Sequence, residues 1–155
     1  MKALSIRQPW AWCILYGGKR VENRTWPTRF RGPIYIHAGL KYDKESLRGI
    51  EDVIEAWPKA TRPPAVCGAL AGTATIVDCV SADDVPPEQR EWVTGPWCFI
   101  LENVIPLAEP IPYKGALGFF DVVLPTNALR PSALQVVSMF GDSADDAMAP
   151  SLTSR

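Results

Sequence analysis

Hydrophobic and polar positions alternate along the first 125 residues in short runs that glycine and proline separate. The clearest alternation lies in residues 33–38, where isoleucine and alanine alternate with Tyr35 and His37, as in a strand with one buried face. Glycines inside the longer runs indicate bulges or bends. The pattern predicts strands or extended segments over residues 2–6, 20–24, 33–38, 65–80 (one long strand or two), 96–104 and 117–123.

Two stretches have the spacing of helices that pack on a core. Pro9 suits the first position of a helix that runs to Tyr16, where two glycines end it. A second helix is predicted over residues 43–57, with Asp43 as its cap and one apolar face. Residues 86–92 are predicted to form a helical turn. Several uneven strands with two helices predict an α+β fold built on a small, partly closed β-barrel.

The length of 155 residues is that of one domain, but the composition changes at Pro125. Beyond it alanine, serine, aspartate, proline and methionine dominate, and tryptophan, tyrosine and cysteine are absent. We therefore predict a domain over residues 1–125 and a flexible or lightly docked tail over 126–155, with a short helix near 133–139. The chain has no apolar run of about 20 residues and no cleavable apolar start, so we expect no membrane insertion.

The cysteine pattern does not suggest a metal site or a disulfide framework. The four cysteines show no C-x-x-C spacing, and the single histidine cannot complete a usual zinc set. Each cysteine has apolar neighbours, which favours buried free thiols and a reducing, cytoplasmic location. No dinucleotide or phosphate-loop fingerprint is present. We expect neither a metal nor a cofactor.

The formal net charge of -1 conceals an asymmetry along the chain. Residues 1–40 hold seven Lys and Arg against the single acid Glu22, a net charge of +6, and they also hold six aromatic residues. Cations neutralise phosphate and flat rings stack on bases, so this stretch suits a nucleic-acid or nucleotide site. A solvated basic edge over an aromatic core is the alternative. The near-neutral total argues against broad nucleic-acid coating and favours a short strand or a single nucleoside.

The densest polar cluster is residues 17–26, with the sequence GGKRVENRTW. In an extended segment Glu22 and Arg24 share one face, and Lys19 at the glycine turn can swing towards it. Trp26 is a candidate to stack on a ligand. A Glu22–Arg24 salt bridge that only fixes the loop is the alternative.

Other polar residues are weaker candidates. Ser5, Arg7 and Gln8 precede the first helix, where they could contact an anion or a base edge, or cap the helix. Tyr113 and Lys114 lie on a proline-flanked loop that could close a cleft or be an ordinary turn. The strand residue His37 is more often structural than catalytic. One of Trp10 and Trp12 is expected in the core, and the other could form a stacking wall.

The spacing Gly17-x-Lys19-x-x-Glu22-x-Arg24 resembles the GxKxxExR signature of the ASCH domain, a relative of the PUA domain. The resemblance covers about residues 2–124. Its other blocks stand in the order of small bacterial and phage ASCH proteins: LSIRQPWA at 4–11, ENRTW at 22–26, RGPIYIHA at 31–38 and PIPYKGALG at 110–118.

This resemblance implies a PUA-like β-barrel with flanking helices and a cleft beside the first helix, lined by the signature residues. It implies binding of RNA, other single-stranded nucleic acid, or a modified nucleoside. One relative hydrolyses N-acetylated cytidine, and another is described as a ribonuclease. The catalytic lysine of the deacylating relative falls on Lys19, but its threonine nucleophile falls on Glu22. A carboxylate cannot replace that hydroxyl, and Thr25 is out of register.

The main hypothesis is therefore RNA or modified-nucleobase binding, with Arg7, Arg20, Arg29 and Arg31 along a phosphate path. The predicted ligand-binding residues are Ser5, Arg7, Gln8, Lys19, Glu22, Arg24, Trp26, Tyr113 and Lys114. The alternative is an amidohydrolase on acylated cytidine or a ribonuclease, in which Lys19 activates water or the nucleophile and Glu22 shuttles a proton. A protein-interaction adaptor is the third hypothesis.

Overall fold

The computed structural model describes residues 1–45, 50–59 and 61–124 of the chain. Met1–Val122 form one compact unit by their contacts. A second unit, Val123–Arg155, is described only for its first two residues. The predicted tail and its short helix near 133–139 lie outside the described residues and stay predictions.

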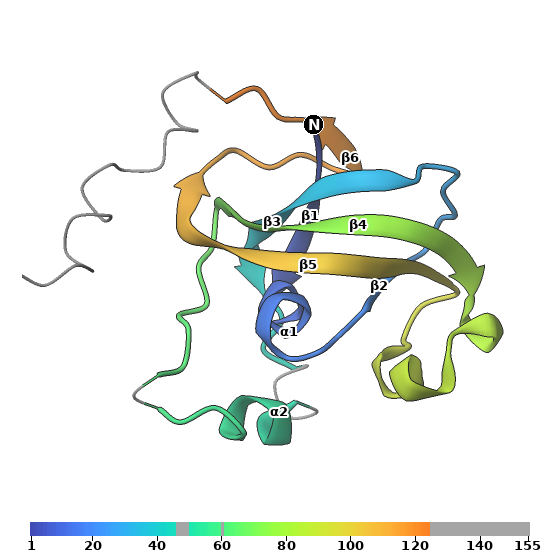
Figure 1. The fold of residues 1–155 in the computed structure, drawn as a ribbon, viewed down its shortest axis with the longest axis horizontal. Helices are drawn as coiled ribbons and strands as arrows, with labels where there is room; N and C mark the ends of the chain where they lie inside the picture. The colour runs from blue at the N-terminus through green and yellow to red at the C-terminus, as the bar shows by residue number, and fades with distance from the viewer. Residues whose placement is uncertain (46–49, 60, 125–155) are drawn as a thin grey trace, which may run out of the picture. The chain divides into compact units, whose positions relative to one another are not determined.

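The compact unit is a mixed sheet with short helices, which confirms the α+β class (Figure 1). Among the described residues no helix has the length and apolarity to cross a membrane. The elements in chain order are β1 (Lys2–Gln8), α1 (Trp10–Tyr16), β2 (Val21–Arg24), β3 (Gly32–Tyr42), α2 (Glu51–Glu55), β4 (Ala69–Ser81), 3-10 turns at Ala82–Asp84 and Pro87–Trp92, β5 (Trp97–Pro112) and β6 (Phe119–Asp121).

The six strands form one sheet in the order β2-β5-β4-β3-β1-β6. The β1 and β3 strands are parallel, and every other neighbouring pair is antiparallel. In Figure 1 the long strands β4 and β5 run side by side, with α1 next to the sheet. The edges β2 and β6 do not pair within the described residues, so the sheet is open and the predicted barrel closure is wrong. With four and three residues, these edge strands are too short to form a seam.

Side chains connect the two ends of the sheet where hydrogen-bonded strands do not. The ring of Trp26, just after β2, packs edge-on against Phe119 of β6 with centroids 5.6 Å apart. Arg24 of β2 donates from Nη2 to the carbonyl of Ser5 in β1 at 2.7 Å. These contacts keep β2 near β1 and β6 without a continuous ladder.

Two predicted elements differ most in extent from the structure. The fifth strand continues to Pro112 instead of ending at residue 104, because three register shifts against β4 let its irregular half stay paired. The helix predicted over 43–57 is described only at Glu51–Glu55. Asp43 is not helical, and its backbone N–H donates to the carbonyl of Gln8. Residues 46–49 lie outside the described residues, so the capping role expected of Asp43 stays a prediction.

The first helix lies between two hydrophobic clusters, with five of its seven residues buried. Ile14 and Leu15 pack with the sheet, whereas Trp12 and Cys13 pack with the segment that holds Trp92. Burial raises the pKa of the Cys13 thiol to about 11. The described cysteines are all free, but the expectation that they are buried is wrong for Cys67, which is exposed.

Substitution of Gly72 in β4 tests how closely α1 packs on the sheet. A Cβ there would lie 2.3 Å from Leu15 Cδ2 and 2.8 Å from the backbone oxygen of Ile105. The backbone oxygen cannot simply rotate away, so Gly72→Ala should lower the free energy of unfolding by about 1–3 kcal/mol in urea titrations.

Gly39→Ala is the matched control within the same sheet. Its Cβ would meet nothing closer than the Ile6 oxygen at 3.5 Å, an ordinary contact. We expect its free energy of unfolding to stay within about 1 kcal/mol of the wild-type value. Equal losses in the two variants would contradict the tight packing inferred at Gly72.

Candidate functional site

A cleft of about 1010 Å³ opens where β1, β2, β3 and the loop after β5 meet. Its walls come from segments far apart in sequence: residues 5–7 and Trp10, Lys19 with residues 22–26, the end of β3, and the loop 113–117. Eight of the nine predicted ligand-binding residues line it: Ser5, Arg7, Lys19, Glu22, Arg24, Trp26, Tyr113 and Lys114.

The floor of the cleft holds a carboxylate between two cations. The Nζ atom of Lys19 lies 3.5 Å from Glu22 Oε2, and Arg24 Nη2 lies 3.1 Å from Glu22 Oε1. The side chains of Lys19, Glu22 and Arg24 are 1%, 8% and 18% exposed, so these are buried or nearly buried contacts. The shared face predicted for Glu22 and Arg24 is present, and the predicted salt bridge forms together with the cleft.

Lys19 is an unusual group because an ammonium is rarely so fully buried. It donates to the carbonyl of Val21 and lies 5.8 Å from the centre of the Trp10 ring. Burial lowers the pKa of Lys19, and the nearby Glu22 carboxylate raises it part of the way back. The amine therefore loses its proton more readily than an exposed lysine does.

Local backbone structure sets the position of these three side chains. The backbone N–H groups of Gly17 and Lys19 both donate to the carbonyl of Cys13, which folds the chain back against α1. Gly18 between them has a φ of 78°, which favours glycine. The following strand β2 pairs with β5, with Glu22 opposite Phe99 and Arg24 opposite Trp97.

Asn23 fixes the other side of β2. Its Oδ1 accepts hydrogen bonds from the backbone N–H groups of Thr94 and Gly95, and its Nδ2 donates to the carbonyl of Trp92. The asparagine thus ties β2 to the segment before β5. This holds the Glu22 and Arg24 side chains on the cleft face.

A second polar group lies on the β1 and β3 side of the cleft. Ser5 and His37 are opposite each other in the parallel β1–β3 pair, and Ser5 Oγ lies 2.9 Å from His37 Nδ1. His37 Nε2 lies 2.9 Å from the carbonyl of Tyr113, so the imidazole also ties down the loop. Gly115 of that loop rests against both side chains, since a Cβ there would lie 2.7 Å from Ser5 Oγ.

Gln8 is the predicted ligand-binding residue that does not line the cleft. Its Nε2 donates to the carbonyl of Val66 at 2.7 Å, and its Oε1 accepts from the backbone N–H of Trp12 at 3.0 Å. It is 2% exposed and borders a separate cavity of about 90 Å³. Of the two roles that the sequence allows for Gln8, the structure places it in the helix-capping one.

Two of the arginines predicted along a phosphate path are also used elsewhere. Arg20 donates to the carbonyl oxygens of Ile14 and Lys19, and Arg31 pairs with Asp78 at 2.7 Å. Neither lines the cleft, and Arg29 does not line it either. Of the four arginines predicted along a phosphate path, Arg7 alone is among the residues that line the cleft, and a path through the other three stays a prediction.

The sequence reasoning did not assign His37, Lys41 or Asp43 to the cleft, although all three line it. A signal for two of them exists in the strand period, since His37 and Lys41 lie four residues apart on β3 and share a face. Because the predicted strand ends at residue 38, the prediction does not place Lys41 on the same strand as His37. Of the two tryptophans on α1, Trp10 lines the cleft and Trp12 is buried in the core.

The lining side chains are positively charged overall, in contrast to the chain. Five cations and two carboxylates line the cleft, a formal net charge of +3 with His37 neutral, against -1 for the whole chain. Within the described ranges, no group of three or more His, Cys, Asp and Glu side chains could hold a metal ion. The arrangement can bind anions at its rim and polar ring edges at its floor.

Comparison with known proteins places this architecture in a family. The model of the ASCH domain matches residues 4–111, so the loop with Tyr113 and Lys114 lies beyond the matched region. Activating signal cointegrator 1 of Homo sapiens is 31% identical over 122 residues, and that of Mus musculus is 30% identical over 122. Each alignment covers 72% of this chain and 20% of the relative, so the chain spans about a fifth of their length.

Lys19 should make stability depend on pH. Because its pKa is lower in the folded chain, the unfolded chain binds more protons between that lowered value and the usual 10.5. The free energy of unfolding should therefore rise with pH across this window and level off above it. We expect the wild-type value minus that of Lys19→Met, measured in urea at each pH, to show this rise.

The difference between the two proteins is used because the Cys13 thiol titrates in the same pH range. Its pKa is raised in the folded chain, so its contribution makes the free energy of unfolding fall with increasing pH. The thiol is present in both proteins, so its contribution largely cancels. A difference that stays flat or falls with increasing pH would contradict a lowered pKa for Lys19.

Proposed function

This chain belongs to the ASCH domain family, and we propose that its cleft binds RNA or a single nucleoside, with one base at the floor. The observation that carries the proposal is the buried Glu22 carboxylate between Lys19 and Arg24, with tryptophans beside both cations. A buried ion cluster of this kind costs desolvation free energy, which a purely structural floor could avoid with apolar side chains.

The floor has donors and an acceptor suited to the edge of a base. A carboxylate oxygen has more than one lone pair, so Glu22 can accept from an exocyclic amine, as carboxylates do from cytosine. Lys19 and Arg24 are the donors for a ring carbonyl. The Nε of Arg24 is buried and has no hydrogen-bond partner within the described residues. This combination favours a base that carries an amine next to a carbonyl.

Aromatic rings stand close to this floor. The Trp10 ring centre lies 5.8 Å from Lys19 Nζ, and that of Trp26 lies 6.0 Å from Arg24 Cζ. Both rings line the cleft and are only partly buried. Stacking of a base on such a ring contributes about 1–3 kcal/mol and tolerates different bases.

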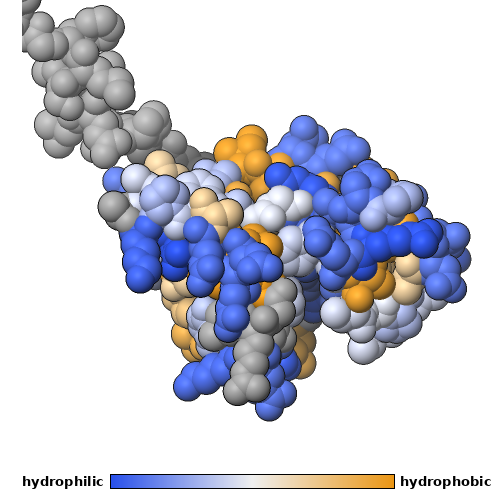
Figure 2. Space-filling model, turned by 90° about the horizontal axis from the view of Figure 1, so that it is seen from below, coloured by the Kyte–Doolittle hydropathy of each residue, from blue (hydrophilic) through white to orange (hydrophobic). Residues whose placement is uncertain are grey.

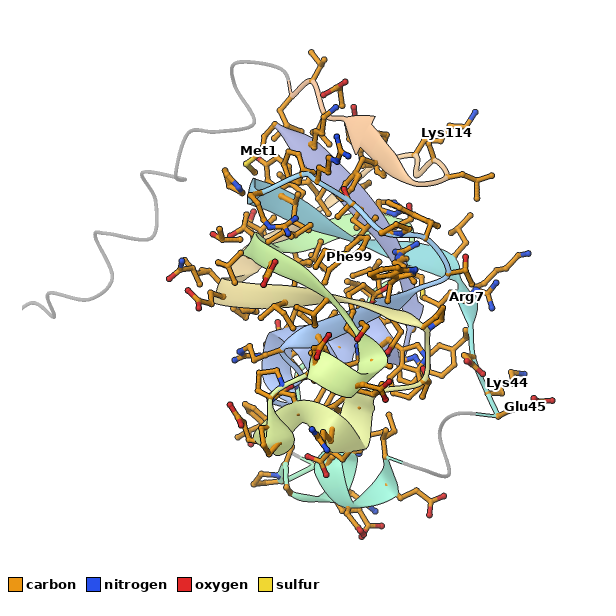
Figure 3. The ribbon with its side chains drawn as sticks, turned by 90° about the vertical axis from the view of Figure 1, so that its right-hand side faces the viewer. Met1, Arg7, Lys44, Glu45, Phe99 and Lys114 are labelled. Carbon is orange, nitrogen blue, oxygen red and sulfur yellow. The ribbon has the colours of Figure 1, made fainter. Side chains whose placement is uncertain are left out.

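The rim supplies cations for phosphate. Arg7, Lys41 and Lys114 are exposed and line the cleft from β1, β3 and the loop after β5. Figure 3 shows Arg7 and Lys114 projecting on the same side of the molecule, whereas Phe99 lies between the strands. Three rim cations suit a short strand of a few nucleotides, because each contacts about one phosphate.

A hydrolase that uses Lys19 and Glu22 is the second candidate. The lowered pKa of Lys19 favours it, because a neutral amine can act as a base or a nucleophile. Glu22 lies within 3.5 Å of that amine and can exchange a proton with it. An adaptor role is less well supported, since the face seen in Figure 2 is mostly hydrophilic, with hydrophobic residues in small patches.

Glu22→Gln tests the base-binding floor. The substitution keeps the shape but removes the charge that accepts from an exocyclic amine and pairs with two cations. We expect at least tenfold weaker binding of cytidine-containing short RNA by calorimetry, with the fold verified by its melting curve. The control is Asp78→Asn, which removes a carboxylate outside the cleft, and should bind as the wild type does. Equal affinity in both variants would refute the site.

Lys114→Ala tests the rim. The loss of one phosphate contact should weaken RNA binding and reduce the slope of log affinity against log salt by about 0.7. Lys2→Ala removes a cation that pairs with Asp121 outside the cleft, and its slope should match the wild type. An unchanged slope in Lys114→Ala would exclude the loop from the phosphate path.

Incubation of the wild-type chain with N-acetylated cytidine and with short RNAs, with and without Mg²⁺, separates the two candidates. The binding proposal expects no turnover of any of these compounds. Turnover that is lost in both Lys19→Met and Glu22→Gln would establish the hydrolase instead. Binding of a protein with the cleft variants unaffected would favour the adaptor.

A further inference from the structure

Ser5 and His37 form a hydrogen-bonded pair whose proton positions follow from the atoms around it. The carbonyl of Tyr113 can only accept, so at 2.9 Å from His37 Nε2 it places the imidazole proton on Nε2. In the neutral ring Nδ1 then carries a lone pair. The Ser5 hydroxyl, 2.9 Å away, therefore donates its proton to Nδ1. A hydroxyl aimed at an unprotonated imidazole nitrogen is poised to lose its proton.

We propose that Ser5 is a nucleophile and His37 its general base, and that the cleft hydrolyses small carboxylic esters. Both side chains line the cleft. The serine, the imidazole and a third group that orients the imidazole are the arrangement by which hydroxyl nucleophiles are activated. Here the third group is the carbonyl of Tyr113. The proposal stands independently of nucleic-acid binding, because none of its atoms belongs to the Lys19–Glu22–Arg24 cluster.

The reaction balances with water as the only co-reactant. Ser5 Oγ attacks the ester carbonyl carbon as its proton moves to His37 Nδ1, and the carbonyl electrons move onto oxygen. Collapse breaks the bond to the alkoxy group, which takes the proton from Nδ1 and leaves as an alcohol. Water then attacks the acyl-serine ester and gives a proton to Nδ1, which returns it to Ser5 Oγ as the carboxylic acid leaves.

The surrounding structure holds the pair in place from three sides. β1 and β3 set the two residues directly opposite each other, and Arg24 Nη2 donates to the Ser5 carbonyl at 2.7 Å. The His37 ring also packs edge-on against Phe120, with centroids 5.7 Å apart. Because His37 is 2% exposed, its ring has little freedom to turn away from the serine.

The loop over the pair can supply donors for a developing oxyanion. Gly115 lies so close that a Cβ would be 2.4 Å from His37 Cε1 and 2.7 Å from Ser5 Oγ, so only glycine fits here. The backbone N–H groups of Gly115 and Ala116 donate no hydrogen bond within the part of the chain that the structure describes. Backbone N–H groups are common stabilisers of the oxyanion in acyl-transfer intermediates.

A fluorophosphonate probe, which forms a covalent bond to activated serines with loss of fluoride, tests the nucleophile directly. After labelling of the full chain, peptide mass spectrometry should place the adduct on Ser5. Ser81→Ala is the matched control, because it removes a hydroxyl that donates to Asp84 at 2.7 Å outside the cleft, and it should label as fast as the wild type. A wild-type chain unlabelled at Ser5 would overturn the proposal.

His37→Gln separates a general base from a structural histidine. The glutamine amide can still donate to the Tyr113 carbonyl, but it cannot take the serine proton. The labelling rate should therefore fall by about 10²–10⁴-fold while the melting temperature changes little. Labelling at the wild-type rate would overturn the assignment of His37.

Hydrolysis of p-nitrophenyl acetate by the wild-type chain tests the nucleophile without relying on a His37 variant that folds. An initial burst of one p-nitrophenol per chain, absent in Ser5→Ala, is expected from an acyl-enzyme intermediate. The same hydrolysis in Ser5→Ala as in the wild type would exclude Ser5. Because these measurements contain no nucleic acid, their failure leaves the RNA-binding proposal intact, and failure of that proposal leaves them unchanged.

Discussion

The buried Glu22 carboxylate, compensated by Lys19 on one oxygen and Arg24 on the other, is the interaction on which the cleft depends. A charge of this kind without a partner costs several kcal/mol, so both cations must reach it from their own backbone positions. The glycine turn brings Lys19 back along α1, and the two-residue period of β2 brings Arg24 to the same face. The turn and the strand together thus place two cations on one carboxylate.

Arg24 extends this cluster across the open sheet, because the same guanidinium nitrogen that contacts Glu22 also donates to the Ser5 carbonyl. The Trp26–Phe119 contact reinforces this connection. The cleft therefore lies where two distant ends of the sheet are linked by side chains. Arg24 contacts both the Glu22 carboxylate and the backbone of Ser5, and so joins the two polar groups of the cleft.

Much of the architecture follows from local sequence patterns. Alternation located β3, apolar runs between turn residues indicated the other strands, and the glycine pair located the end of α1. The shared face of Glu22 and Arg24 follows from the strand period, and the cationic stretch of residues 1–40 carries three of the five lining cations. The overestimated helix over 43–57 and the underestimated β5 show the limit of this reasoning. Helical spacing alone does not guarantee a long helix, and bulges allow prolines to stay in a strand.

The sequence by itself determined the α+β class, the ASCH signature and a locally basic segment, because each depends on residues near one another in the chain. Only the tertiary structure decided which polar residues meet. The parallel register of β1 and β3 sets Ser5 opposite His37, thirty-two residues away, and the Val66 carbonyl draws Gln8 away from the cleft. Arg20 and Arg31 likewise turn to internal acceptors. Register and hydrogen-bond competition between distant segments decide these contacts, and neither leaves a periodic trace in the sequence.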